Sequence, residues 1–386
     1  SANVAANGLD LAALRADLPH TELHGSLSAD ANGAGRLALS NRAAGLVNEG
    51  KLPLTEVQLA FRQDRGAFLF ERITAALGTD KRPAGSIKGG GRYANGALTL
   101  AAQLDALDLQ RIDQRMQATR LSGTLDMRHA AGRQQLSIDL KEPVGKQHAA
   151  LIARATLADA RLAIERAELQ LGSGRLNATG HVDFSQRQTF SAEGQWSRLR
   201  LQDLGQFAQF PALDTSGSFS LHGARQPSLS ADLAFRIHDS RLAGRPLQGD
   251  GRAQLRADRI LIPALSLAAG DNRLDIHGEL SSGDAQLSFA LAAPKLEQLG
   301  PGFGGVLHAS GSARGTFSRP YLSAVWRAAD LRMPGQLQAD SLQAQAELAI
   351  DRNQALRVNA ATMDVSGRAW KTASQPLAAL SPQLQS

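Results

Sequence analysis

The sequence predicts an all-β fold, an extended and repetitive curled β-sheet with a hydrophobic groove, with short helices or loops between repeats. Three observations predict it. Apolar and polar residues alternate strictly over many short stretches, as in strands with one dry face. Turn-forming pairs such as Ser-Gly, Gly-Asp and Asp-Asn separate these stretches. No long stretch has helical period, so helices cannot cover the apolar side of the strands.

The alternation places apolar side chains on one face of several predicted strands. In 229–237, Ser230, Asp232 and Arg236 fall on the opposite face. We expect the apolar set to line the groove and to exclude water passively. These groove-lining candidates are Leu176, Ala178, Val182, Phe184, Leu229, Leu233, Phe235, Ile237, Leu274, Ile276, Leu280, Leu287, Phe289, Leu291, Leu342, Leu348 and Ile350.

Short segments with helical spacing recur along the chain, at 9–16, 107–116, 199–208 and 294–299. Each precedes a predicted strand that carries Gly followed by Ser or Thr, at Gly25, Gly123, Gly217 and Gly311. A period of about 94 residues results, and a second glycine series near mid-repeat has the same period. We therefore predict one continuous array over 1–386, with approximate repeats 9–106, 107–198, 199–293 and 294–386.

Several of these glycines occupy apolar positions of their strands, as Gly25 does between Leu23 and Leu27. Glycine weakens a strand and marks a bend, a bulge or a close backbone approach. One interpretation is a bend where the sheet curls. The other is room for a ligand on the apolar face, and the two are compatible.

Composition excludes several classes of protein. Hydrophobic residues make up 43% and aromatic residues only 4%, so an apolar lining would be aliphatic. With no cysteine, disulfides and thiolate metal sites are excluded. Of the nine histidines only His20 and His24 form a close pair at metal-ligand spacing, and in an extended strand they would lie about 13 Å apart. No catalytic motif is present, so we expect no enzyme, no cofactor and no metal site.

Charge and hydropathy limit the partners. The net charge is +6 and the pI is about 10, but the basic residues are dispersed and alternate with acidic ones. We therefore expect no nucleic-acid binding. No apolar run is long enough to span a bilayer, and no signal peptide is evident. The chain is interpreted as an internal fragment whose membrane anchor lies outside it.

The run 296–324 contains LEQLGPGFGG and HASGSARGTFSRPYLSA, and alternating residues follow it to 350. This order of a Leu-rich segment, a glycine strand and a Pro-x-Leu-x-Ala element resembles the TamB family of translocation and assembly modules. That family belongs to the AsmA-like group within the bridge-like lipid-transfer superfamily. The similarity is clearest over 199–350, weaker over 100–198 and weakest over 1–99, where the proline is missing.

The resemblance implies a β-taco-like fold in a protein that crosses the periplasm of a Gram-negative bacterium. It implies an inner-membrane anchor outside this fragment and partnership with an outer-membrane barrel protein of the TamA type. Phospholipid acyl chains would be the cargo, in lipid transport between the two membranes, and a role in outer-membrane protein assembly is also implied. The family offers no catalytic residues to transfer.

Two other functions stay open. Exposed strand edges could act as a chaperone-like scaffold that pairs with outer-membrane strands by β-augmentation. Alternatively, the array could be a structural closed β-solenoid or adhesin with a filled interior. Whether the Leu-rich face is open or filled distinguishes the conduit from the closed solenoid.

Overall fold

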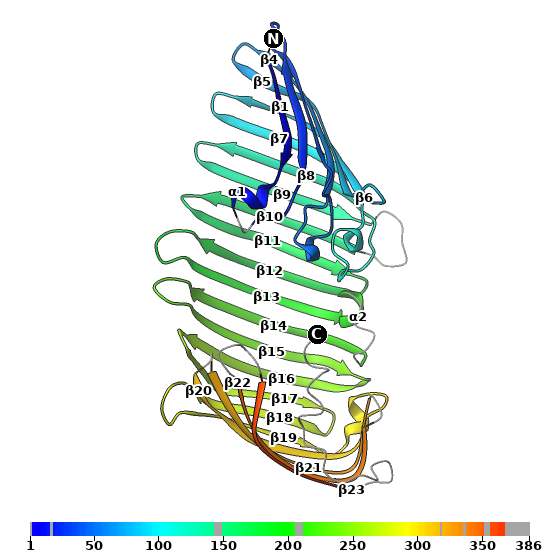
Figure 1. Cartoon of the computed structure of the whole chain (residues 1–386), viewed down its shortest axis with the longest axis vertical. Coiled ribbons are helices and arrows are strands. Elements are labelled where there is room, and N and C mark those ends of the chain that lie inside the picture. The colour runs from blue at the N-terminus through cyan, green and yellow to red at the C-terminus, as the bar shows by residue number, and fades with distance from the viewer. Residues whose placement is uncertain are drawn as a thin grey trace. The chain divides into compact units, whose positions relative to one another are not determined.

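The computed structural model describes residues 2–15, 18–142, 149–204, 211–316, 319–334, 337–350 and 356–366. In these residues the chain is nearly all antiparallel strand, in long sheets that do not close (Figure 1). The predicted all-β fold is therefore confirmed. The chain divides into two compact units, Ser1–Ser185 with Leu201–Phe207, and Gln186–Arg200 with Ala208–Ser386.

In the first unit each strand pairs antiparallel with the next one along the chain, as in a meander. Short helical turns α1 (Leu11–Leu14), η1 (Val47–Glu49) and η2 (Leu109–Arg111) interrupt it, and α2 (Leu201–Leu204), which follows β13 along the chain, is also counted with this unit. The strands are β1 (Ala2–Leu9), β2 (Leu23–Ala29), β3 (Ala34–Asn41), β4 (Leu54–Asp64), β5 (Ala67–Thr79), β6 (Arg82–Ala94), β7 (Ala97–Leu107), β8 (Leu121–Ala130), β9 (Arg133–Lys141), β10 (Ala149–Ala158), β11 (Arg161–Leu171) and β12 (Gly174–Asp183).

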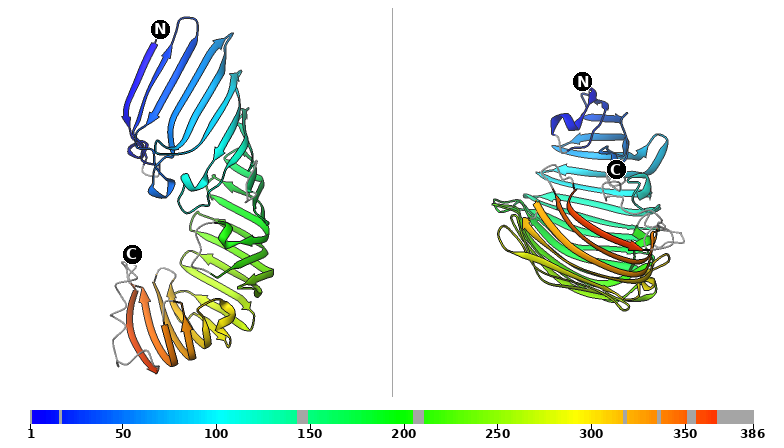
Figure 2. Two further views of the ribbon diagram at one scale, coloured as in Figure 1. Left: turned by 90° about the vertical axis from the view of Figure 1, so that its right-hand side faces the viewer. Right: turned by 60° about the horizontal axis from the view of Figure 1, so that its bottom comes forward.

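The second unit is also a meander, and its sheet curls between its first and last strands (Figure 2). One helical turn, η3 (Leu296–Leu299), lies between β19 and β20. The strands are β13 (Thr189–Arg200), β14 (Leu213–Ala224), β15 (Ser230–Leu242), β16 (Arg245–Arg256), β17 (Arg259–Ala269), β18 (Asn272–Leu280), β19 (Gln286–Ala293), β20 (Gly304–Thr316), β21 (Arg319–Met333), β22 (Leu337–Ile350) and β23 (Leu356–Ser366).

Each segment with helical spacing contains a short helical turn in the structure. In the described part of the chain, α1, η2, α2 and η3 follow β1, β7, β13 and β19, so six strands separate consecutive ones. None of these segments contains η1, which has no helical spacing in the sequence. The division into four repeats stays a prediction, which this order of elements supports.

The turns around α1 and η2 share one hydrogen-bond pattern. Asp10 Oδ1 accepts from the backbone N–H groups of Ala12 and Thr21, and the Thr21 hydroxyl donates to the Leu9 carbonyl. Around η2, Asp108 and Thr119 make the equivalent bonds, and Thr119 Oγ1 also accepts from the Leu109 N–H at 3.0 Å. Both helical turns are thus held at the same place, after the strand that precedes them.

Most of the recurrent glycines, which include Gly91, Gly180 and Gly278 of the mid-repeat series, lie opposite irregularities of the sheet. The neighbouring strand shifts register next to the partner of each of them except Gly311, as in a β-bulge. Gly123 and Gly278 also have positive φ, at 159° and 113°, which favours glycine. The interpretation of a local bend is therefore supported for Gly25, Gly91, Gly123, Gly180, Gly217 and Gly278.

Candidate functional site: the apolar face

Strand register in the second unit lines up the predicted apolar residues. Direct cross-strand partners point to the same face of a sheet. Leu233 pairs with Leu221 and Ala253, and Phe235 pairs with Phe219 and Gly251. Farther along, the row runs from Leu265 through Ile276 and Phe289 to Gly311, Ala324 and Ala346. The sequence-predicted sets therefore share one face, which we call the apolar face of this unit.

The first unit has an equivalent apolar face that the groove-lining candidates did not include, except for Leu176, Ala178 and Val182 on β12. Strand pairing in this unit lines up apolar residues that are not among the groove-lining candidates. Their alternation with polar residues is visible in the sequence, as in Val57-Gln58-Leu59-Ala60-Phe61. One row consists of Val4, Leu27, Leu37, Leu59, Ile73, Gly89, Ala102, Leu125, Ile138, Ala153, Ala167 and Ala178.

The opposite face of each unit is polar. Arg273 and Asp275, two residues apart on β18, form an ion pair of 2.6 Å, and Arg166 and Glu168 do the same on β11 at 2.7 Å. These bonds lower the pKa of both carboxyl groups, chiefly through the hydrogen bond from the arginine. The two faces of the strands thus differ as the alternation predicts.

Most groove-lining candidates are half-buried rather than enclosed. Leu233 is 39% exposed, and Phe184 and Leu229 are also exposed, although both lie just outside their strands. Leu280 is the exception among the described side chains, since it is only 6% exposed. The side chain of Ile350 lies outside the described residues. A sheet face with a filled interior would instead bury its large residues fully.

Aromatic rings on the apolar face lie against glycines of the neighbouring strand. A Cβ atom at Gly251 would come within 2.7 Å of the Phe235 ring, and one at Gly311 within 2.6 Å of the Phe289 ring. The Trp196 ring covers Gly217 in the same way. The ring occupies the space where a side chain at the glycine position would lie. These glycines therefore leave space for an aromatic side chain of the neighbouring strand, in addition to any role in bending.

The two margins of the apolar face differ. We call the strand ends that are joined through α1, η1, η2, α2 and η3 the helix-side margin, and the opposite strand ends the turn-side margin. At the helix-side margin, Leu104, Leu121 and Leu140 are buried in a cluster that Leu109 of η2 contacts. In the second unit, Leu296 of η3 is buried with Leu331. The helical turns η2 and η3 therefore pack on this end of the apolar face, whereas Leu14 of α1 and Val47 of η1 are exposed.

The turn-side margin is open by comparison. In the second unit it lies on the left of Figure 1. In the first unit the strand ends at this margin are joined by tight turns, such as Asn95-Gly96 and Ala131-Gly132. Most exposed large apolar residues of this face lie in the half nearer to these turns: Val4, Leu27, Tyr93, Leu136 and Leu233. Leu9, 40% exposed at the helix-side end of β1, is an exception. The apolar face is thus covered around η2 and η3 and more accessible toward the turn-side margin.

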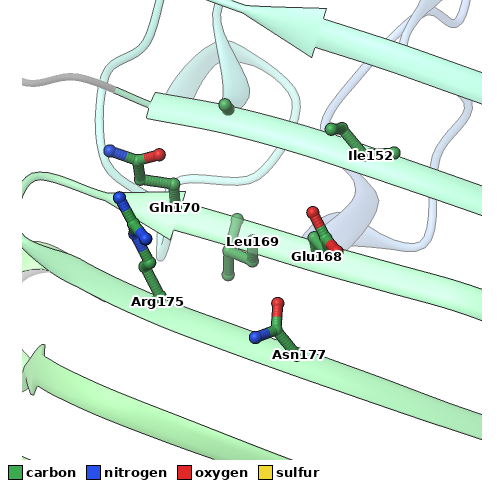
Figure 3. Close-up of a pocket in the computed structure, with 7 residues that line it drawn as sticks. Ile152, Glu168, Leu169, Gln170, Arg175 and Asn177 are labelled. Atoms are coloured by element: carbon green, nitrogen blue, oxygen red, sulfur yellow. The ribbon is translucent and has the colours of Figure 1, made fainter.

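The polar face has a shallow hollow of about 340 Å³ over β10, β11 and β12. Figure 3 shows Glu168, Gln170, Arg175 and Asn177 around it, with Ile152 and Leu169. Glu168 is already paired with Arg166. The hollow is a depression between side chains of the solvated face, and it does not belong to the apolar face.

The described residues contain no group of three or more His, Asp or Glu side chains that could hold a metal ion. No helix within the same residues is long and apolar enough to cross a membrane. His24 is hydrogen-bonded to Glu22 at 3.1 Å, and His20 to Asp10 at 3.2 Å. The histidine pair of the N-terminal region therefore does not converge on a shared point.

An unclosed antiparallel sheet with one accessible aliphatic face and one polar face defines the class of open, amphipathic β-sheet proteins. The family model described as "TamB, N-terminal domain" matches residues 1–381. The chain belongs to the TamB family. It is therefore a component of the translocation and assembly module of the cell envelope. Neither a curated protein nor a solved structure matches the chain significantly.

Proposed function

We propose that the apolar face is a conduit for phospholipid acyl chains between the inner and the outer membrane. One observation carries this proposal. Large aliphatic side chains align across consecutive strands, and most of them stay half-exposed, as Leu233 and Leu287 do. A monomeric sheet that served only as a scaffold would cover such a face, since extended exposed apolar patches mark binding surfaces.

The energetics favour a hydrocarbon guest. Exposure of a 16-carbon chain to water costs about 12 kcal/mol at about 0.8 kcal/mol per methylene. A continuous apolar face reduces this cost at every position, because each row offers similar aliphatic contacts. Hydrogen-bonding groups are scarce in the middle rows, so no position would hold the chain strongly. Such a surface suits movement of the guest along the sheet.

The partners and the location follow from the family and belong to the same proposal. The protein would act in the periplasm of a Gram-negative bacterium, with an inner-membrane anchor in a part of the protein outside this chain. An outer-membrane barrel of the TamA type would receive the cargo, and assembly of outer-membrane proteins would use the same partnership. Membership in the translocation and assembly module supports these proposals.

Photo-crosslinking in cells tests the conduit. A photoreactive amino acid replaces Leu233 on the apolar face of the full-length protein. The matched control replaces Arg236, which is also exposed but lies on the opposite face of the same strand. We expect phospholipid adducts at position 233 at least about fivefold above those at 236, because acyl chains contact only the apolar face.

Two results would contradict this proposal. Equal lipid adducts at both positions would indicate non-specific membrane contact. Adducts of unfolded barrel proteins at position 233, without lipid, would favour the chaperone-like scaffold instead.

The same comparison can be made in the first unit. There, Leu27 and Ser28 on β2 are a second pair of exposed positions on opposite faces of one strand.

A further inference from the structure

The unequal margins determine how an amphiphile could lie on the first unit, if the proposed function holds. At the helix-side margin of β7–β10, the apolar face ends in a buried cluster of leucine and alanine side chains that includes Leu104, Leu121 and Leu140. A charged or hydrogen-bonding headgroup placed there would lose its water without compensation. The headgroup of a bound lipid must therefore lie toward the turn-side margin.

Polar side chains stand on the apolar face at this margin. Cross-strand register joins Gln63 of β4 to Phe68, Phe68 to Tyr93 of β6, Tyr93 to Leu98, and so on across six strands. The full row is Gln63, Phe68, Tyr93, Leu98, His129 and Gln134. We call its polar members, Gln63, Tyr93, His129 and Gln134, the polar rim.

The rim is accessible and has hydrogen-bonding capacity to spare. Gln63, Tyr93 and Gln134 are exposed, Tyr93 at 42%. His129 Nδ1 is shielded from solvent and has no hydrogen-bond partner among the described residues. A shielded polar atom without a partner is costly, and a ligand atom that hydrogen-bonds to it would remove the cost.

Directly inside the rim the face is apolar again. The next row comprises Phe61, Phe70, Gly91, Leu100, Met127 and Leu136. Polar and apolar rows thus lie side by side along the margin. Tyrosine is suited to such a boundary, because its ring is apolar and its hydroxyl is polar.

The described strands β13–β18 of the second unit do not have this feature. Their corresponding row at the turn-side margin contains no hydrogen-bonding side chain: Phe190, Gly223, Ala231, Leu255, Ile260 and Leu280. The polar rim is therefore not a general consequence of strands ending near solvent. It belongs to β4–β9.

We propose that the polar rim is a binding site for the headgroup side of a phospholipid. Neighbouring strands lie about 4.8 Å apart, so one headgroup reaches only part of the row. Gln134, the His129 ring N–H and Tyr93, on β9, β8 and β6, donate hydrogen bonds to its ester and phosphate oxygens, and Gln63 on β4 offers a further donor along the rim. The acyl chains lie on the adjacent row with Phe61, Leu100 and Met127. The site binds a diacyl lipid in one orientation, headgroup outward at the turn-side margin.

The test separates headgroup contacts from hydrocarbon contacts. The intact purified protein is incubated with phosphatidylethanolamine vesicles, re-isolated, and its bound lipid is measured by mass spectrometry. Diphenylhexatriene, a hydrocarbon probe without a headgroup, is measured in parallel by fluorescence. The rim variant combines Gln63→Leu, Tyr93→Phe, His129→Leu and Gln134→Leu. The control combines Thr99→Val and Gln135→Leu, which lie on the polar face of β7 and β9.

We expect the rim variant to bind about tenfold less phospholipid, and as much diphenylhexatriene as the unmodified protein. The control should bind both normally. Undiminished phospholipid binding by the rim variant would overturn the inference, and so would an equal loss of both ligands. If the unmodified protein bound neither ligand, the proposed conduit itself would fail, and the inference with it.

Discussion

Glycine and aromatic residues act as pairs on the apolar face. Phe235 on β15 lies over Gly251 of β16, and Phe289 on β19 lies over Gly311 of β20. A ring that lies against the backbone fills space without projecting from the sheet. Glycine is therefore required at a position where the alternation alone would place a larger apolar residue.

Gly251→Ala tests this pairing. The new Cβ would lie 2.7 Å from Phe235 Cε1, so the ring has to move. We expect a loss of about 1–3 kcal/mol in the free energy of unfolding, measured by urea denaturation. The double variant Gly251→Ala with Phe235→Leu should recover part of that loss, because the ring is gone while Leu265 Cγ still lies 3.0 Å from the new Cβ. If the double variant were no more stable than Gly251→Ala, the ring contact would not explain the glycine.

Short helical turns do more for this sheet than their length suggests. η2 and η3 each place a leucine, Leu109 or Leu296, against strand residues at the helix-side margin. Asp108 and Thr119 hold η2 in position through backbone hydrogen bonds. The turns cannot cover a sheet, but they close one margin of its apolar face.

A comparison of Leu296→Ala with Leu233→Ala measures how unevenly the apolar face is covered. Leu296 is 4% exposed and lies in a buried cluster, so its truncation should cost about 2–5 kcal/mol. Leu233 is 39% exposed, so the same change should cost less than about 1 kcal/mol. Chemical denaturation of both variants provides the measurement. A cost at Leu233 as large as at Leu296 would mean that Leu233 lies in a filled core.

Across the whole molecule, ionised carboxylates on the polar side and in the turns contribute to stability. The pKa of Asp10 is lowered by the Thr21 backbone N–H and by His20, and that of Asp113 by Arg115. Hydrogen bonds from Ser281 and Arg259 lower the pKa of Glu279. Such groups stabilise the fold above their ordinary pKa, because the folded state then holds the charged form.

Acidification should therefore lower the free energy of unfolding only at low pH, where these carboxyl groups bind protons. The free energy of unfolding should stay nearly constant down to about pH 5 and decrease below it, as these carboxyl groups bind protons. Thermal unfolding between about pH 7 and pH 3 measures the trend. In Asp275→Asn the decrease should be shallower, because one lowered pKa is removed. A loss of stability already between about pH 8 and pH 6 would contradict the assignment to carboxylates.

The sequence by itself determined the kind of structure. Strand periodicity depends on local backbone geometry, so alternation revealed the strands and their two faces. The positions of α1, η2, α2 and η3 were recognisable in the same way, as were the recurrent glycines. The resemblance of 296–324 to TamB proteins was also visible in the sequence, and the match over 1–381 confirms it.

Only the tertiary structure decided which rows align, which margin is covered and where polar groups reach the apolar face. Register and bulges place Tyr93 beside Phe68 and Leu98, and no single stretch of sequence contains that row. The contacts of Gly251 and Gly311 likewise depend on an aromatic ring from the neighbouring strand. Burial of Leu104 or exposure of Leu233 depends on whether a distant turn packs above it, and alternation is the same in both cases.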